Sequence, residues 1–266
     1  MNKLVLFGAS IALSAGMLSA QSKHEKVVYH DSNVQSGDLT LKGEDAVSTA
    51  EYLKFKIKVD NKSNDIIIYK PEESMVKING KDFAPKEKWI SVKPIDSDHK
   101  VVDIKGTGMR ENEFTFQVEG LYKVNPDDKP IAAEDFQLPA SQNGFKAGNF
   151  TCNMLDLKKE TDETKVKFEC VYTGDKIGII HTNRAAVRLP DGTEIANNRV
   201  KAGFEVLQKG DSQKFNLVWK RMEGGKATDM QKIKLAIIWR NTFVESEAVK
   251  VPGGTLTFKI DESKSK

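Results

Sequence analysis

Cysteine and histidine are scarce in this sequence. Its 266 residues include two cysteines and four histidines. The two cysteines have neither a C-x-x-C spacing nor histidine neighbours, so they match no metal-binding or redox signature. No G-x-S-x-G, H-E-x-x-H or phosphate-binding glycine motif occurs either. We therefore predict no catalytic residue, no metal ligand and no cofactor, although a Ser-His-Asp triad assembled from distant positions stays open.

An excess of one charge is also lacking. The chain carries 41 Lys and Arg against 38 Asp and Glu, which gives a formal net charge of +3. An excess this small does not indicate binding to nucleic acid or to an anionic membrane surface. We expect no nucleic-acid partner, and we expect the interleaved charges to form a solvated surface.

Long apolar runs are absent after the first residues. Lys3 precedes an apolar stretch over residues 4–18, and Ser19 and Ala20 follow it. This order is typical of a secretory signal peptide that is cleaved after Ala20. The run is too short to favour a permanent membrane span, although an uncleaved anchor is the alternative. We expect residues 1–20 to be removed, and the mature chain, without a membrane span, to be periplasmic or extracellular.

Alternating apolar and polar residues dominate the rest of the chain. Leu53, Phe55, Ile57 and Val59 occupy every second position, and lysines lie between them. Such a segment is a strand with one buried face and one face in water. Further alternating segments are residues 113–119, 214–219, 232–237 and 255–260. Many short strands separated by Gly, Pro and Asn turns predict an all-β chain of the sandwich type.

The order of these segments occurs twice. An alternating strand, a short apolar strand and a strand with a glycine turn follow one another at residues 54–59, 65–69 and 75–81, and again at 167–172, 176–181 and 186–193. The offset of about 110 residues matches one immunoglobulin-sized sandwich. Chance similarity of short strands is the alternative.

This repeat predicts the domain organisation. We expect two tandem antiparallel β-sandwich domains over residues 37–140 and 145–261, with a boundary in the polar stretch at 139–144. A polar N-terminal segment over residues 21–36 precedes the first domain. A disordered tail over residues 262–266 follows the second.

The second repeat also carries a resemblance to a known group. After an alternating strand and an apolar strand, Val187 begins a strand that runs into a hairpin at Asp191-Gly192-Thr193. In this pattern the chain resembles the immunoglobulin-like or telokin-like domains of exported bacterial proteins. The resemblance implies immunoglobulin-like sandwiches and an extracytoplasmic setting. It implies no functional residue, because a fold does not determine a function.

Cys152 and Cys170 lie in two alternating segments joined by a polar stretch. A reversal of the chain at Thr161 places the cysteines opposite each other on one face of an antiparallel pair. Non-hydrogen-bonded pairs bring Cα atoms to about 4.5 Å, which is within disulfide range. An exported protein meets an oxidising environment, so we predict a Cys152–Cys170 disulfide. A register slip of one residue would instead leave two free thiols on opposite faces.

Two residues are candidates for ligand binding. Trp89 follows Lys88 and precedes an aliphatic segment; an exposed indole there is a platform for a sugar, and burial in the core is the alternative. His99 follows an Asp-Ser-Asp sequence, so a carboxylate can orient its imidazole, or the ring is simply exposed. The acidic loops at residues 96–98 and 125–128 offer the oxygen ligands that calcium prefers, but without the EF-hand spacing.

These patterns lead to an expectation about function. We expect an exported, non-catalytic binding or structural protein of the cell envelope, with another envelope protein as its partner. Such domains bind through sheet edges, sheet faces and loops, and the stretch at 139–144 is expected to line an interdomain groove. The alternative is a carbohydrate-binding module that uses Trp89, or an enzyme on cell-wall polysaccharide with paired carboxylates in a cleft.

Overall fold

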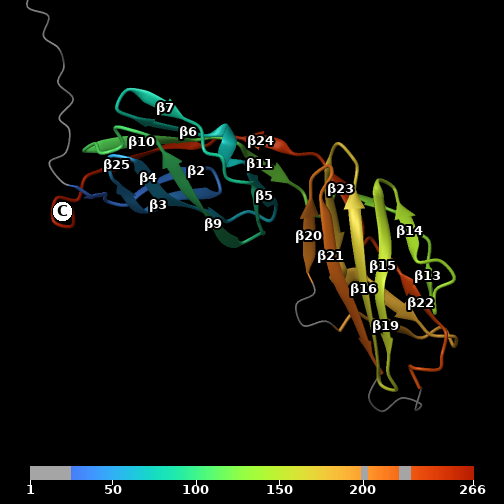
Figure 1. The fold of residues 1–266 in the computed structure, drawn as a ribbon. Coiled ribbons are helices and arrows are strands. Elements are labelled where there is room, and N and C mark those ends of the chain that lie inside the picture. The colour runs from blue at the N-terminus through green and yellow to red at the C-terminus, as the bar shows by residue number, and fades with distance from the viewer. Residues whose placement is uncertain (1–24, 199–202, 222–228) are drawn as a thin grey trace, which may run out of the picture.

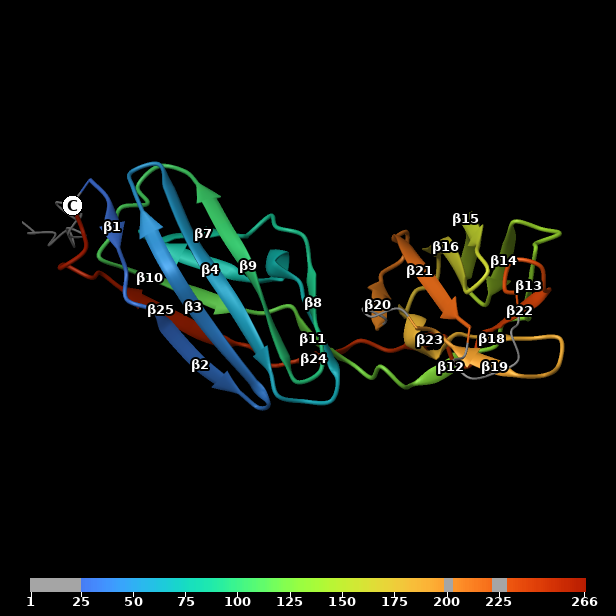
Figure 2. The same ribbon diagram turned by 90° about the horizontal axis from the view of Figure 1, so that it is seen from below.

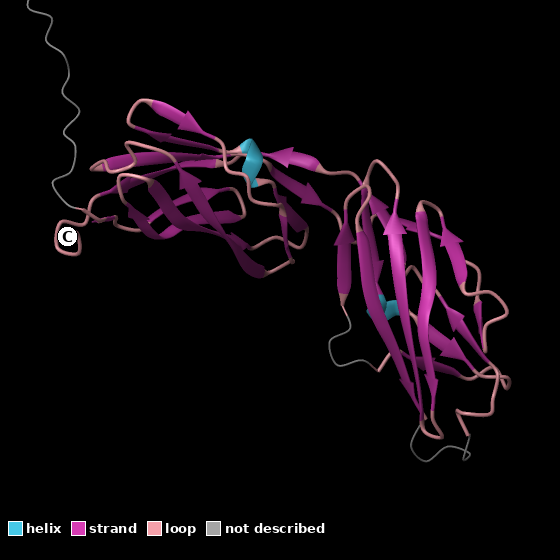
Figure 3. Cartoon of the chain, viewed as in Figure 1, coloured by secondary structure: helices cyan, strands magenta, loops and turns pink. Residues whose placement is uncertain are grey.

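The computed structural model describes residues 25–198, 203–221 and 229–266, so the predicted signal peptide lies outside the described residues. Antiparallel strands make up almost all of the secondary structure. The helices within these ranges are two short 3-10 turns, η1 (Pro71–Glu73) and η2 (Thr182–Arg184). Figures 1 and 3 show two sandwich-like lobes placed end to end. The predicted all-β class is confirmed.

The first lobe contains the N-terminal strands and, in addition, the last two strands of the chain. Its strands are β1 (Val27–Val28), β2 (Ser32–Ser36), β3 (Leu39–Ser48), β4 (Tyr52–Asn61), β5 (Ile66–Tyr69), β6 (Met75–Ile78), β7 (Lys81–Phe83), β8 (Ile90–Val92), β9 (Asp96–Lys105), β10 (Glu113–Val118), β11 (Leu121–Val124), β24 (Val249–Val251) and β25 (Gly254–Lys259). They form sheets in the orders β1-β3-β4-β9, with β2 also paired to β3, then β25-β10-β6-β7, and β24-β11-β5-β8.

The second lobe is continuous in sequence. Its strands are β12 (Lys129–Ile131), β13 (Phe136–Leu138), β14 (Gly144–Ala147), β15 (Phe150–Lys159), β16 (Glu163–Tyr172), β17 (Ile177–His181), β18 (Ala186–Arg188), β19 (Glu194–Ala196), β20 (Phe204–Leu207), β21 (Ser212–Lys220), β22 (Leu235–Ile238) and β23 (Phe243–Ser246). Its sheets have the orders β14-β15-β16-β21, β13-β22-β18-β19 and β12-β23-β17-β20.

Apart from β1, the two lobes match strand for strand, but two strand pairs are exchanged between them. β12 and β13 follow β11 in the chain, yet they pair with β23 and β22 of the second lobe. β24 and β25 follow β23, yet they pair with β11 and β10 of the first lobe. Figure 1 shows the red C-terminal strand β25 lying beside the green strand β10. Each sequence repeat therefore gives its last two strands to the other lobe.

This exchange corrects the expected domain boundaries. The predicted boundary at residues 139–144 separates the sequence repeats, but the chain crosses between lobes at residues 125–128 and 247–248. The predicted domains 37–140 and 145–261 each include a strand pair that belongs to the other lobe. The physical reason lies at Val124, the last residue of β11, which is buried at the junction of the lobes. The chain leaving it continues directly into the second lobe.

Residues 27–36, expected to belong to a polar N-terminal segment, form β1 and β2 of the first lobe. Val27 and Tyr29 are buried there, although the apolar pattern is too short to indicate a strand. Within the described ranges, no helix is long and apolar enough to cross a membrane.

Each lobe has its own aromatic core. In the first lobe, the rings of Phe114 and Phe258 stack with centroids 4.3 Å apart. In the second lobe, Phe168 contacts Phe136 and Phe215, with ring centroids at 5.4 Å and 5.8 Å. Burying one such side chain contributes about 1.5–3 kcal/mol. The exchanged strands thus supply core residues, Phe258 and Phe136, to the lobes that receive them.

A third apolar cluster joins the lobes. It consists of six buried side chains, three from each lobe: Ile66, Ile68 and Val124, and Ile177, Ile179 and Val244. Polar contacts fix the first crossing segment beside it. His181 Nε2 lies 2.7 Å from the Pro126 carbonyl oxygen, and Arg184 forms an ion pair with Asp127. Burial lowers the pKa of His181, and the hydrogen bond from Arg184 lowers the pKa of Asp127.

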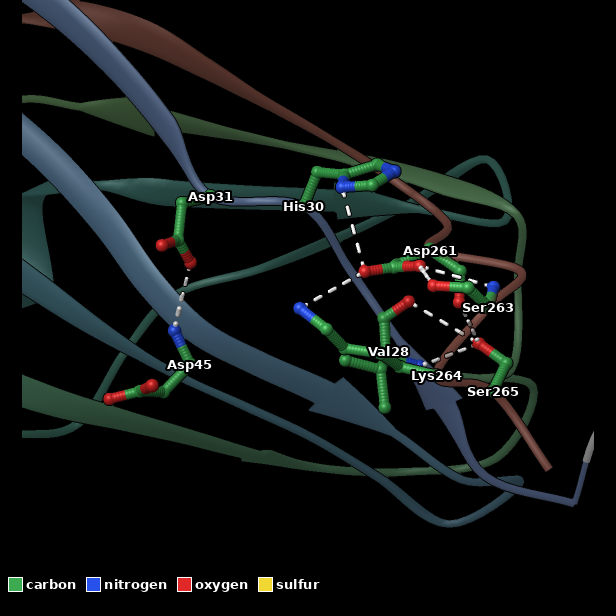
Figure 4. Close-up of polar contacts among 8 residues, drawn as sticks. All are labelled: Val28, His30, Asp31, Asp45, Asp261, Ser263, Lys264 and Ser265. Carbon is green, nitrogen blue, oxygen red and sulfur yellow. Dashed lines mark hydrogen bonds and ion pairs between the residues drawn. The ribbon is translucent and has the colours of Figure 1, made fainter.

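The C-terminal tail packs on β1 at the far end of the first lobe (Figure 4). The Asp261 N–H donates to the Val28 carbonyl at 2.7 Å, and the Val28 N–H donates to Ser265 Oγ at 3.0 Å. The Asp261 carboxylate accepts from the Ser263 N–H at 3.1 Å and lies 3.2 Å from Lys264 Nζ. Residues 262–266 thus differ from the expected disordered tail, because backbone and hydroxyl hydrogen bonds hold them without any apolar pattern.

Candidate functional site

The predicted disulfide is present and joins the two central strands of the sheet β14-β15-β16-β21. Cys152 and Cys170 are direct partners across β15 and β16, with Cα atoms 4.0 Å apart. Both are fully buried. In the first lobe the corresponding cross-strand pair is Leu41 and Val59. The fold itself therefore does not require a disulfide here, and the second lobe has a covalent link where the first lobe has an aliphatic pair.

β14, next to Cys152, is a short edge strand with unused backbone groups. Phe145 pairs with Cys152, and the Met154 N–H donates to the Asn143 carbonyl at 2.6 Å. Because hydrogen-bonded residues alternate along an antiparallel pair, the N–H and C=O groups of Gly144 and Lys146 point away from β15. Among the described residues, these four groups have no hydrogen-bond partner.

A groove runs along this edge. Its volume is about 670 Å³, within the range of ligand-binding clefts. One side is formed by β14 with Phe145 and Lys146 and by residues 151–153 of β15, and the other by the β12–β13 connection with Ala133 and Glu134. The groove therefore has an apolar side chain, small residues, and one charge of each sign. No hydrogen bond joins β13 to β14 within the described part of the chain.

The first lobe has an equivalent edge strand, but there the space beside the strand is filled. β2 corresponds to β14, and it lies against β25. The Thr257 N–H donates to Ser32 Oγ at 3.1 Å, and Ser36 Oγ donates to the Pro252 carbonyl at 2.7 Å. Val34 fills the space over Gly254, where an added Cβ would lie 2.8 Å from it. The contrast lies in the packing of side chains on β25. The outward N–H and C=O groups of Asn33 and Gln35 in β2, like those of Gly144 and Lys146, have no hydrogen-bond partner among the described residues.

The turn after β14 is held by a small polar network. The Asn149 Nδ2 donates to Glu245 Oε1 at 2.7 Å, and the Tyr172 hydroxyl donates to the same oxygen at 3.3 Å. Burial raises the pKa of Tyr172, and the neighbouring Glu245 carboxylate raises it further. The hydroxyl therefore stays protonated as a donor, and the turn is fixed against β23.

Trp89, a predicted binding residue, lies elsewhere. It is half-buried and packs against the apolar cluster that joins the lobes. Nearby, Lys93 Nζ lies 5.7 Å from the centroid of the Phe204 ring across the junction. The indole thus packs against the cluster between the lobes, and its role as a platform for a sugar stays a prediction.

His99, the second predicted binding residue, is exposed on β9 in the first lobe. Its Nδ1 lies 3.9 Å from Asp98 Oδ1, and about half of each side chain is exposed. His99 and Trp89 share no hydrogen bond or ring contact with the β14 groove. The acidic loop at residues 125–128 is the first crossing segment, where Asp127 pairs with Arg184. No group of three or more metal-ligating side chains occurs among the residues that the structure describes.

The groove was only partly indicated by the sequence. The stretch at 139–144 was expected to line an interdomain groove, and Gln142 and Gly144 do line this one. The groove lies within the second lobe, however, because the chain crosses between lobes before β12. Phe145 and Lys146 belong to no recognisable binding motif. The only feature of the sequence that indicates a site here is Gly144, which lies beside a short alternating segment.

Comparisons with known proteins give no family. No family model matches the chain, and a comparison with curated proteins found no match. Among solved structures, the chain is similar to red sea bream transglutaminase, with 8% sequence identity and a TM-score of 0.20. The similarity covers 82% of this chain and 31% of that protein. A similarity at this score supports no inference about fold or activity.

Proposed function

We propose that this chain is an exported, non-catalytic binding protein of the cell envelope, built from two immunoglobulin-like sandwiches. Its second lobe binds a partner protein in the β14 groove, and its first lobe, which carries the N-terminal strand and the C-terminal tail, supports the second lobe. One observation carries the proposal: the edge that is closed by β25 in the first lobe is left open at β14 in the second.

The buried disulfide supports an exported location. Disulfides persist in oxidising compartments and are rare in the cytosol. Cys152 and Cys170 are linked and fully buried, and the start of the sequence has the pattern of a signal peptide. Both features favour the periplasm or the cell exterior.

The positions of the termini support the division of roles. β1 and the C-terminal tail lie together at the end of the first lobe that faces away from the second lobe (Figures 1 and 2). Any attachment through either terminus therefore leaves the second lobe as the distal end. The β14 groove is then free to meet a partner.

The experiment is site-specific photo-crosslinking in the organism's own cell envelope. A photo-reactive amino acid replaces Lys146 in one protein and Gln35 in the control. Gln35 occupies the position in β2 that Lys146 occupies in β14, as the two registers show. We expect one protein partner to be linked in stoichiometric amount from position 146 and not from position 35. Equal labelling from both positions, or none from 146, would refute the proposal.

A further inference from the structure

We propose that the groove takes an extended peptide segment of the partner protein, which adds to β14 as a new edge strand. This inference rests on the proposed function and specifies its binding mode. The peptide presents an apolar side chain toward Phe145 and an acidic side chain toward Lys146.

The backbone of β14 supports strand addition. The N–H and C=O groups of Gly144 and Lys146 point away from β15 and have no partners among the described residues. An unpaired strand edge is a template for an added strand, whose main-chain hydrogen bonds supply affinity.

The side chains of β14 determine which peptide fits. Phe145 is half-buried on the inner face, with its ring centroid 4.7 Å from that of Trp239 and 5.6 Å from that of Phe136. Lys146 is exposed on the outer face. Side chains directly across adjacent strands interact, and opposite charges there are stabilising. The complementary strand therefore alternates apolar and polar residues and carries an acidic residue on its polar face.

The long edge strand of the first lobe is, by contrast, blocked against addition. Along β9, the Ser97, His99 and Asp103 N–H groups donate to carboxylates at 2.8, 2.7 and 2.9 Å. Acidic side chains that occupy outward amides protect a sheet edge from pairing.

In β21, the corresponding edge strand of the second lobe, side chains also accept hydrogen bonds from outward N–H groups. Its Val218 and Lys220 N–H groups donate to Asn197 and Asn198 side chains at 3.0 and 3.1 Å. The long edges are thus protected in both lobes, whereas Gly144 and Lys146 of β14 have no such caps.

A second copy of the chain is a poor occupant. Pairing of β14 with β14 of another copy brings two Lys146 side chains onto one face of two four-residue strands. Like charges on adjacent strands are destabilising. Across from Lys146, a heterologous peptide with an acidic residue is therefore the occupant that this charge favours.

The test uses a synthetic seven-residue peptide of alternating valine and threonine with a central glutamate. Its control has the same sequence with an N-methylated backbone, which removes the N–H donors. Binding to the full mature chain is measured by titration calorimetry. We expect the first peptide to bind and the N-methylated peptide to bind at least about tenfold more weakly, since it loses main-chain hydrogen bonds.

Two variants at one position separate backbone from side chain. Lys146→Pro removes the outward N–H, which an edge strand tolerates, and it is expected to weaken binding about tenfold. Lys146→Thr keeps the N–H and is expected to weaken binding less than about fivefold, through loss of the charge pair. Lys146→Glu weakens binding of the glutamate peptide and restores binding of a lysine-centred peptide. Thermal melts of all three variants establish that they are folded.

Three results would overturn strand addition. They are equal binding of the N-methylated peptide, equal effects of Lys146→Pro and Lys146→Thr, and a concentration-dependent dimer that excludes the peptide. If photo-crosslinking at Lys146 still captures one partner in any of these cases, the proposed function stands and only the binding mode fails. If neither peptide nor partner contacts this edge, both fail.

Discussion

Phe136 and Phe258 stabilise lobes that their positions in the sequence do not indicate. Phe136 belongs to the first sequence repeat but packs in the second lobe, and Phe258 belongs to the second repeat but packs in the first lobe. Replacing each with alanine therefore tests the strand exchange directly. Phe258→Ala should destabilise the first lobe, and Phe136→Ala the second.

The magnitude follows from burial. Phe258 is fully buried and stacks on Phe114 at 4.3 Å, and Phe136 is 7% exposed with its ring 5.4 Å from that of Phe168. A buried Phe→Ala substitution costs about 3–5 kcal/mol, from lost burial and the cavity left behind. Because 1.4 kcal/mol is a factor of ten, amide exchange in the affected lobe should accelerate at least about a hundredfold.

Hydrogen exchange resolved by residue is the assay, with the Phe55 amide as reporter for the first lobe and the Phe168 amide for the second. Both lie in central strands, β4 and β16. In Phe258→Ala we expect the larger acceleration at Phe55, and in Phe136→Ala at Phe168. The reverse assignment, with Phe258→Ala affecting chiefly the second lobe, would refute the exchanged pairing.

Three further predictions concern stability. Replacing Cys152 and Cys170 with the Leu and Val that the first lobe has at these places should lower the free energy of unfolding by about 3 kcal/mol in guanidinium chloride, and an unfolded variant would contradict the equivalence of the sites. Burial lowers the pKa of His181, so the unfolded chain binds the proton first and stability should fall as the pH drops below about 6.5. In thermal melts, the His181→Gln variant should lose this dependence of stability on pH. An unchanged dependence would argue against His181 as its cause. Hydrogen bonds from Ser263 lower the pKa of Asp261. The Asp261 carboxylate therefore stabilises the fold above the ordinary aspartate pKa, and this stabilisation is lost as the pH falls toward the lower pKa of the folded state. In an acid titration, the Asp261→Asn variant should not show this loss of stability, and a loss as large as in the unchanged protein would rule the carboxylate out as its cause.

Local patterns allowed much of the fold to be predicted. The alternation from Leu53 to Val59 corresponds to β4, and all four apolar side chains are buried. The equal distance of Cys152 and Cys170 from the chain reversal at Thr161 predicted their pairing, and it is confirmed. In each case the signal lies within one strand or one hairpin.

The strand exchange could not be predicted in this way. Phe136 on β13 pairs with Ile237 on β22, and Phe258 on β25 pairs with Phe114 on β10. Both repeats offer the same type of edge, so the apolar pattern suits either arrangement. The choice depends on where β11 and β23 end relative to the junction, which is a property of the assembled lobes.

The candidate site was hidden for a related reason. The edge at Gly144 and Lys146 is open because no other described strand forms hydrogen bonds with their outward backbone groups. This can be known only once the strands have been placed. Trp89 and His99 were predicted as binding residues from the types of their side chains. The structure shows that Trp89 packs between the lobes and that His99 lies on a protected edge.

The most direct test of the binding site is amide exchange at β14 with and without the valine–threonine peptide. In the free protein, the Gly144 and Lys146 amides should exchange fast, because they point away from β15, while the Phe145 amide is already protected by its pairing with Cys152. We predict that the peptide slows exchange at Gly144 and Lys146 and leaves Phe145 nearly unchanged. A peptide that binds while both outward amides keep exchanging at their free rates would contradict β14 as the binding edge.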